Sequence, residues 1–189
     1  SERFLIAARE VPGVTHATLA ATIPFWSNEG RGLWVPGVDS ISRKGRFILQ
    51  AGSPDYFTTM GTRIVRGRAF DATDRKGGPN VVVVSEGMAK AIWPGQDAPG
   101  KCVRIGADTA PCSTVIGVAE EMRTRSLTDT REYTYYIPAT QFDLPMEPQL
   151  FARVNGDAAT LVDDLRTRLQ RELPGAAYAN TMTLGRLID

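Results

Sequence analysis

The chain has 189 residues, of which 42% are hydrophobic and 23% charged, and its formal net charge is +1 at pH 7. This is the composition of an ordinary globular protein, and the length suffices for one or two modest domains. Because nucleic-acid-binding proteins normally carry a strong basic excess, the near-neutral charge argues against that class. No apolar run reaches the roughly 18 residues of a transmembrane helix, and the first residues do not have the pattern of a secretion signal.

The N-terminal part of the chain predicts a helix followed by three strands. Residues 1–10 carry apolar side chains on one helical face, whereas residues 14–23 alternate apolar and polar side chains as a half-buried strand does. Two further strands are expected at residues 33–38 and 46–51. Helix and strand are therefore mixed from the start of the chain.

A short helix is expected immediately after the third of these strands. Ser53 is the predicted N-cap, Pro54 suits the first helical position, and Gly61 supplies the C-terminal stop. Three large side chains at helical spacing then share one buried face: Tyr56, Phe57 and Met60. This stretch is expected to be part of the scaffold.

The middle of the chain predicts a strand, a helix and a hairpin. The β-branched run at residues 81–84 indicates a buried strand, after which Ser85 is the expected N-cap of a helix. Residues 101–106 and 113–118 predict two strands joined by a short loop. An aromatic-rich strand is expected at residues 133–137.

The C-terminal part predicts a β-α-β unit. Residues 149–154 form the first strand of this prediction, Asp157 is the N-cap of a helix over residues 158–172, and residues 177–181 form the second strand. A right-handed crossover is the expected connection between two such strands. A last helix is expected to begin near Leu184.

Several phrases of the sequence occur in the order typical of one family. They are PDYFTTMG (residues 54–61), RGRAF (66–70), VVVVSEGMAKAIWPGQDAPG (81–100), STVIGV (113–118) and YYIP (135–138). Together they resemble the periplasmic core domain of MacB/FtsX-like ABC transporter permeases. The resemblance covers about residues 50–140 in wording and the two ends mainly in pattern.

The predicted fold class is α+β, built from α/β-type units in a discontinuous arrangement. Residues 71–80 form a charged, glycine-containing connector, and residues 143–148 read as a second linker. We therefore expect one subdomain to comprise residues 1–70 plus 146–189 and to be interrupted by a second lobe, residues 71–145. The resemblance implies that the first is the porter-like α/β subdomain and the second the Sabre-like lobe.

The resemblance also implies a function. It predicts a non-catalytic domain on the extracytoplasmic side of a bacterial inner membrane that transmits ATP-driven movement, with no cofactor. The expected partners are a second permease copy and a cytoplasmic ATPase, reached through transmembrane helices before residue 1 and after residue 189, and a periplasmic adaptor protein. The alternative is a module that binds a ligand or a lipoprotein in the cleft between the two lobes. A stand-alone enzyme is disfavoured, because the sequence has no obvious set of catalytic residues.

Two groups of residues are candidates for mechanical or partner-binding roles. The expected hinge residues are Arg66, Gly67 and Phe70 at one linker and Asp143 and Pro145 at the other. The expected partner contacts are the two tryptophans that flank a polar loop, Trp26 and Trp34.

Three motifs that suggest chemistry have better structural explanations. Residues 95–101 fit the pattern G-x-x-x-x-G-K, but they follow a predicted helix and precede a strand, the reverse of a phosphate-binding loop. His16 is the only histidine, so a two-histidine metal site is excluded. The arginines of residues 63–68 could bind an anion or a lipid headgroup, but the nearby Asp71 and Asp74 favour local ion pairs.

The two cysteines, Cys102 and Cys112, flank the loop of the predicted hairpin. In an oxidising compartment such a pair tends to form a disulfide, which would stabilise the fold by about 3 kcal/mol in the chain-entropy model. Two free thiols are the alternative, and redox or metal chemistry is a third possibility. A disulfide is the preferred interpretation.

Overall fold

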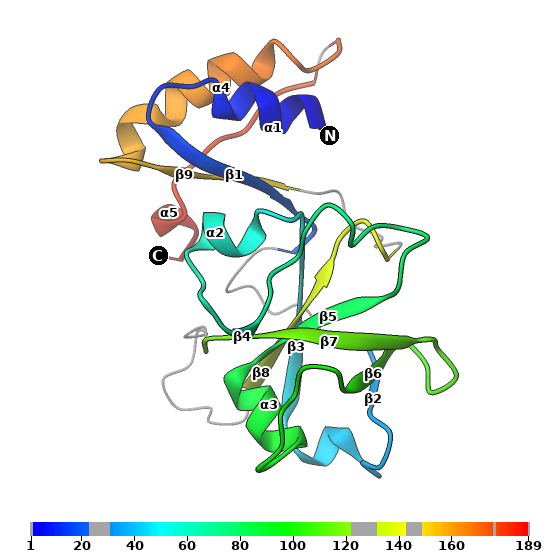
Figure 1. Cartoon of the computed structure of the whole chain (residues 1–189). Helices are drawn as coiled ribbons and strands as arrows, with labels where there is room; N and C mark the ends of the chain where they lie inside the picture. Colours follow the sequence, from blue (N-terminus) through cyan, green and yellow to red (C-terminus); the bar gives the residue numbers. More distant parts are fainter. Residues whose placement is uncertain (1, 23–30, 122–131, 143–148, 176, 189) are drawn as a thin grey trace.

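One mixed sheet runs through the molecule and is bent into two parts (Figure 1). The computed structural model describes residues 2–22, 31–121, 132–142, 149–175 and 177–188. The elements follow one another in this order: α1 (Glu2–Arg9), β1 (Val14–Ala20), β2 (Leu33–Trp34), η1 (Ile41–Arg43), β3 (Arg46–Gly52), α2 (Tyr56–Met60), β4 (Ile64–Gly67), β5 (Val81–Ser85), α3 (Glu86–Ile92), β6 (Cys102–Ile105), β7 (Cys112–Ala119), β8 (Glu132–Pro138), β9 (Gln149–Val154), η2 (Ala158–Leu161), α4 (Val162–Gln170) and α5 (Gly185–Ile188).

The strand order is β2-β6-β7-β5-β8-β3-β1-β9, and β4 pairs with β7 beside this path. β3 runs parallel to β8 along its whole length, and β5 runs parallel to β7. The remaining pairs are antiparallel. β1 pairs with β9 over its whole length but with β3 only through Ala20 and Gly52, so the sheet is narrowest at that point.

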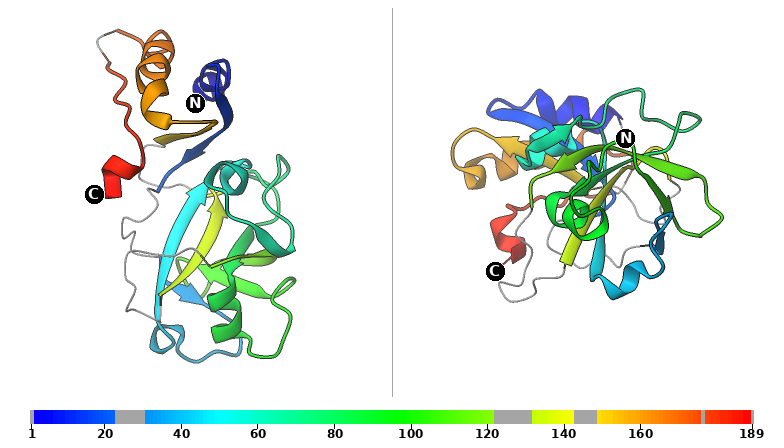
Figure 2. Two further views of the ribbon diagram at one scale, coloured as in Figure 1. Left: turned by 90° about the vertical axis from the view of Figure 1, so that its left-hand side faces the viewer. Right: turned by 60° about the horizontal axis from the view of Figure 1, so that its bottom comes forward.

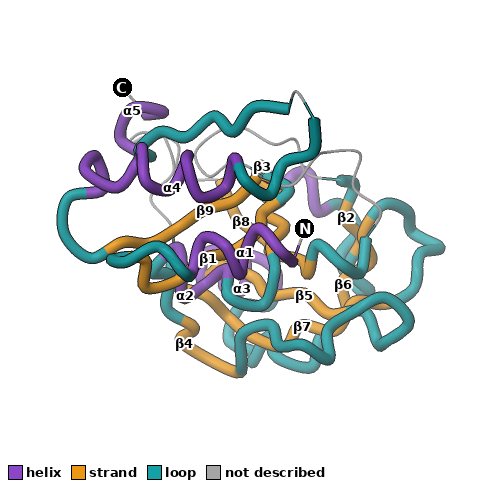
Figure 3. Tube along the Cα trace, turned by 90° about the horizontal axis from the view of Figure 1, so that it is seen from above, coloured by secondary structure: helices purple, strands orange, loops and turns teal. Residues whose placement is uncertain are grey.

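Each of the two parts of the molecule has a core of its own, and a third apolar cluster joins them, since it contains Ala20 of β1 and Phe151 of β9. The terminal unit consists of α1, β1, β9, η2 and α4, with the two helices side by side over the two strands (Figure 3). Its core is formed by side chains of these elements: Ala7, Ala8, Val11, Ala17, Leu165 and Leu169. The large unit, residues 31–142 in their described part, contains the other strands with α2 and α3. The two units are separated in the side view, where β1 leads from one to the other (Figure 2).

The central strands of the large unit are buried on both faces. Along β5, Val82 and Val84 pack in the cluster that contains α3, whereas Val81 and Val83 pack in the cluster that contains α2. Successive side chains of a strand point to opposite faces, so a strand covered on both sides needs an unbroken apolar run. The predicted buried strand at residues 81–84 is thus confirmed.

Most of the local predictions are confirmed. The Ser85 hydroxyl accepts a hydrogen bond from the Met88 N–H and caps α3, and the Asp157 carboxylate accepts one from the Ala159 N–H and caps η2. Gly61 ends α2 in the left-handed conformation, with φ of 74°. β6 and β7 form the expected hairpin.

Three local predictions are wrong. Residues 177–181 form no strand: the Gln170 side chain bonds the Ala177 carbonyl and the Ala179 N–H, so α4 rather than a sheet satisfies this backbone, and there is no β-α-β crossover. Ser53 is not the N-cap of α2, because Asp55 holds that position. β1 does not alternate as predicted: Thr15 and His16 are both exposed, whereas Ala17, Thr18 and Ala20 are buried, so both faces are covered only in its second half.

Candidate functional site: a junction and a groove

The terminal unit and the large unit meet where β1 leaves the end of β3. The Ser53 N–H donates to the Leu19 carbonyl at 2.8 Å, and the Ala21 N–H donates to the Ala51 carbonyl at 2.9 Å. The Ser53 hydroxyl, freed from capping α2, lies 2.7 Å from the Thr18 hydroxyl and accepts from the Leu19 N–H. A few hydrogen bonds therefore connect the two units at this point.

Two arginines of the terminal unit reach the ends of α2 in the large unit. Arg9 of α1 forms an ion pair with Asp55 at 2.5 Å. Arg153 of β9 donates from Nε to the Thr59 carbonyl at 2.7 Å. α2 is thus contacted at its first turn from one element and at its last turn from another.

The inner side of α2 packs on an aromatic cluster. Phe57 lies with its ring centroid 5.2 Å from that of Phe70 and 5.0 Å from that of Tyr136. Tyr56 donates to the Gln50 side chain at 3.3 Å. Burial raises the pKa of both Tyr56 and Tyr136, so both are neutral at physiological pH.

Burial of its aromatic side chains stabilises α2 in its place more than the exposed ion pair does. Tyr56 and Phe57 are 0% and 2% exposed, and burying one such side chain contributes roughly 1.5–3 kcal/mol. The side chains of Arg9 and Asp55 are 45% and 52% exposed, and such pairs contribute about 0.2–1 kcal/mol. Ala20 of β1 and Phe151 of β9 belong to the same cluster, and α2 lies against both strands, so apolar packing joins α2 to both units.

The expected hinge residues that the structure describes lie inside the large unit. Arg66 and Gly67 pair with β7, and Phe70 is buried in the aromatic cluster with 5% exposure. Asp143 and Pro145 lie outside the described residues. The structure thus does not bring the described hinge residues to the junction, and bending at any of them stays a prediction.

A groove of about 600 Å³ lies beside β4 and α3. Its apolar walls include Val65, Ala89, Trp93 and Val118. Two ion pairs belong to residues that line it, Arg66 with Asp97 at 2.8 Å and Lys90 with Glu86 at 4.0 Å. The groove lies between residues of the two predicted lobes, since β4 precedes residue 71 and α3 follows it.

The arginine-rich segment is neutralised by nearby carboxylates. Arg68 binds Asp74 through both terminal nitrogens, at 2.7 and 2.9 Å, and Asp71 at 3.1 Å. The other two arginines form ion pairs with residues farther along the chain, Arg63 with Glu120 and Arg66 with Asp97. The prediction of local ion pairs with Asp71 and Asp74 is confirmed for Arg68, whereas Arg63 and Arg66 are paired with carboxylates that were not predicted.

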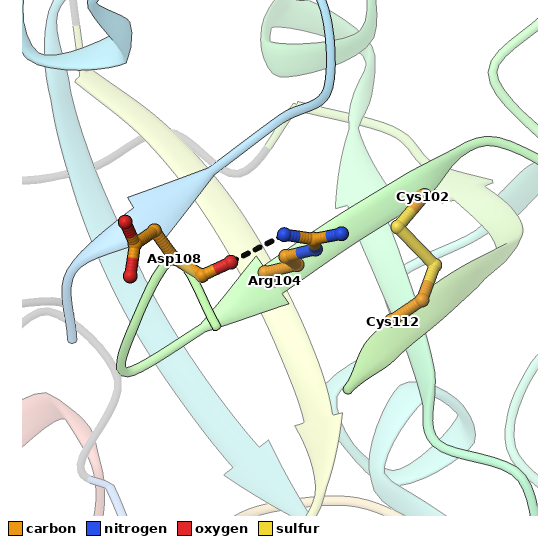
Figure 4. Close-up of a disulfide and its surroundings, with 4 residues drawn as sticks. All are labelled: Cys102, Arg104, Asp108 and Cys112. Atoms are coloured by element: carbon orange, nitrogen blue, oxygen red, sulfur yellow. Dashed lines mark hydrogen bonds between the residues drawn. A yellow bond between two sulfur atoms is a disulfide. The ribbon is translucent and has the colours of Figure 1, made fainter. Parts of the chain in front are cut away.

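Cys102 and Cys112 form a disulfide across the β6–β7 hairpin, with their Cα atoms 5.5 Å apart (Figure 4). Beyond the disulfide, the Arg104 guanidinium donates to the Asp108 carbonyl and closes the hairpin loop. Residues 95–101 lead from α3 into β6, as expected. Trp34, one expected partner contact, is 40% exposed on the edge strand β2, while Trp26 lies outside the described residues.

The part of the chain that the structure describes has neither a metal-binding cluster nor a membrane-spanning helix. It contains no group of three or more His, Cys, Asp and Glu side chains that could bind a metal ion. Within the same ranges, every helix is too short or too polar to cross a membrane.

Comparison with known proteins identifies the family. A family model described as the MacB-like periplasmic core domain matches residues 2–171. The chain belongs to this family. The resemblance to MacB/FtsX-like permeases, drawn from five phrases of the sequence, is thereby confirmed.

Solved structures of MacB-like domains share the fold. The periplasmic region of MacB from Actinobacillus actinomycetemcomitans is 18% identical, with a TM-score of 0.63 over 90% of this chain and 73% of that one. The extracellular domain of the noncanonic ABC-type transporter YknZ from Gram-positive bacteria is 17% identical, with a TM-score of 0.61 over 92% and 81%. A domain of a Porphyromonas gingivalis protein described as a permease is 15% identical, with a TM-score of 0.59 over 97% and 86%. A comparison with curated proteins finds no match.

Sequence reasoning missed the two arginines that join the units of this MacB-like domain. Arg9 and Asp55 are 46 positions apart, and Arg153 and Thr59 are 94 apart. The acceptor of Arg153 is a backbone carbonyl, which has no signature in the sequence. Only the pairing of β1 with β9 brings these groups together.

Proposed function

We propose that this chain is a non-catalytic extracytoplasmic domain of an ABC transporter permease, on the outer side of a bacterial inner membrane. The match of residues 2–171 to the MacB-like periplasmic core domain carries the proposal. In this proposal ATP hydrolysis on the cytoplasmic side moves the domain, and the domain passes that movement to extracytoplasmic partners or cargo.

The shape of the molecule suits a mechanical role. Transmission by rigid-body motion requires compact units that can shift relative to one another about a few residues. Each unit has a core of its own, a third cluster lies where they meet, and their strands share one residue pair, Ala20 with Gly52. The chain passes between the units after β1 and again between β8 and β9, and the second passage includes Asp143 and Pro145. The passage with Asp143 and Pro145 is the first candidate hinge to test. The second candidate hinge comprises Arg66, Gly67 and Phe70.

The partners follow from the same proposal. Both chain ends lie on the side of the terminal unit (Figures 1 and 2). Transmembrane helices attached there would place this unit next to the membrane and the large unit away from it. A second permease copy and the cytoplasmic ATPase would act through those helices, and a periplasmic adaptor would meet the large unit, where Trp34 is exposed.

A cross-link across the junction tests the proposal. Cysteines replacing Thr18 and Ser53, whose hydroxyls are 2.7 Å apart, would lock the two units in the full permease. Transport is expected to fall at least about tenfold in the oxidised variant and to recover on reduction. Wild-type permease under the same reductant controls for loss of the native disulfide. Transport that is unchanged in the fully cross-linked variant would contradict the proposal.

The groove supports a second candidate, a module that binds a ligand or a lipoprotein. Its volume of about 600 Å³ is within the range of small-molecule sites, and such sites are mostly apolar. A fluorescent acylated peptide is expected to bind saturably and to lose at least about tenfold in affinity in the variant Val65→Glu. Leu184→Glu, also at an exposed apolar position, is the matched control. Equal binding by both variants would exclude the groove.

A further inference from the structure

We propose that Arg153 and Arg9 form a polar latch that closes the terminal unit onto α2 of the large unit. The inference rests on the proposed function, because it assigns the contacts that must break when the two units move. It adds two positioning residues to which neither the sequence motifs nor the family match points.

Arg153 provides the stronger contact of the latch. Its Nε donates to the Thr59 carbonyl at 2.7 Å from a partly buried position. Carbonyls in the last turn of a helix have no partner within the helix, so an arginine there satisfies an otherwise open acceptor. The guanidinium also fills the space beside Gly61, where a Cβ atom would collide with its Nη2 atom. The end of α2 is therefore shaped to receive this side chain.

Arg9 provides the second contact, at the opposite end of α2. Its Nη2 atom binds the Asp55 carboxylate at 2.5 Å and the Ala17 carbonyl at 3.2 Å. The side chains of Arg9 and Asp55 are both about half exposed. Water can therefore replace this ion pair at little cost.

The two arginines lie on different elements of one unit, α1 and β9, while both acceptors lie on one helix of the other unit. Tyr56 and Phe57 pack on aromatic side chains of the large unit, and α2 also lies against β1 and β9, whose Ala20 and Phe151 belong to the same cluster. These apolar contacts must part together with the two arginine contacts when the units separate. The two arginines are thus the polar part of the contact between the units.

The latch can be tested by measuring distances in the 189-residue chain itself. Nitroxide labels attached to an unnatural amino acid at Thr109 in the large unit and Thr167 in the terminal unit report their separation without added cysteines. Removing a charged hydrogen bond from a closed state is expected to raise the open population about tenfold. Arg153→Ala should therefore add a second peak to the distance distribution.

The matched control is Arg166→Ala, which removes an arginine whose partner, Asp163, is in the same unit. It should keep the wild-type distribution. If Arg153→Ala does not fold, Asp55→Ala decides, because the Asp55 side chain makes no cap hydrogen bond in α2 and its loss removes only the exposed contact, which should give the same second peak at smaller amplitude. If the deciding variant shows the same distance distribution as the wild type, the latch is refuted. The transport test with Thr18 and Ser53 involves neither arginine, so the two proposals can fail separately.

Discussion

Gly67 and Gly117 lie opposite each other where β4 crosses β7, and neither has room for a side chain. A Cβ on Gly117 would collide with the Arg68 carbonyl, and one on Gly67 would collide with the Ile116 carbonyl. Both obstacles are backbone atoms, which cannot move aside as a side chain can. The approach of β4 to the sheet, and with it one wall of the groove, depends on these two glycines.

We therefore expect Gly117→Ala to destabilise the chain by about 1–3 kcal/mol, as overpacking does. This corresponds to a decrease in Tm of about 2 to 12 °C for a chain of this length. Gly185→Ala is the control, because a Cβ there has open space. Thermal unfolding followed by circular dichroism measures both. Equal Tm values for the two variants would show that β4 can shift without cost.

The disulfide should contribute about 3 kcal/mol to the free energy of unfolding, the value that the chain-entropy model gives for cysteines separated by 10 positions. The double variant Cys102→Ser, Cys112→Ser is expected to lose this amount in urea unfolding. Wild-type chain unfolded in the presence of a reductant should show the same loss. A midpoint that does not change on reduction would refute the estimate.

The pair of Arg68 and Asp74 should be worth more than the pair of Arg66 and Asp97. The Asp74 side chain is 4% exposed and that of Asp97 is 67% exposed. Asp74→Ala removes two hydrogen bonds from Arg68 and the one from the Asp71 N–H, at a cost of about 1–3 kcal/mol. Asp97→Ala, the matched control, should cost about 0.2–1 kcal/mol. Chemical denaturation of both variants measures the difference, and the reverse order would contradict the argument.

Glu120 should contribute to stability at neutral pH and lose that contribution in acid. Its pKa is lowered, first by the hydrogen bond from the Arg63 N–H and then by that from the Arg63 side chain. A carboxyl whose pKa is lower in the folded than in the unfolded state stabilises the fold above its unfolded pKa, and the effect disappears as the pH falls through the folded pKa.

The variant Glu120→Gln should accordingly unfold about 1 to 3 °C below wild type at pH 7. The two Tm values should converge as the pH falls below the unfolded pKa of Glu, about 4.3, and through the lowered folded pKa. Thermal unfolding over this pH range is the measurement. A difference of the same size at every pH would assign the effect to geometry instead of charge.

Local signals in the sequence predicted the elements well but not how distant elements meet. Ser85, Asp157 and Gly61 mark helix ends through bonds within a few residues, so their roles could be read directly. Ser53 has the same capping chemistry, yet its hydroxyl bonds β1, because the Thr18 hydroxyl and the Leu19 N–H lie closer.

The C-terminal error has a similar cause. Residues 177–181 have a strand-like pattern, but a strand also needs a neighbouring strand in the sheet. Here the Gln170 side chain bonds the Ala177 carbonyl and the Ala179 N–H in place of such a neighbour. The groove and the two arginine contacts were likewise beyond prediction, since they depend on strand order. The order of the sequence motifs, in contrast, indicated the family correctly, because the motifs come from elements along much of the chain.

The pairing of β1 with β9 also determines the order in which this chain can fold. β1 emerges from the ribosome well before β9, yet Leu19 and Ala20 pair with Leu150 and Gln149. Pairing of strands so distant in sequence is slow, since the loop between them must close first. The N-terminal strand must therefore wait until the large unit has emerged, and a chain truncated before Gln149 would expose an apolar strand edge open to aggregation.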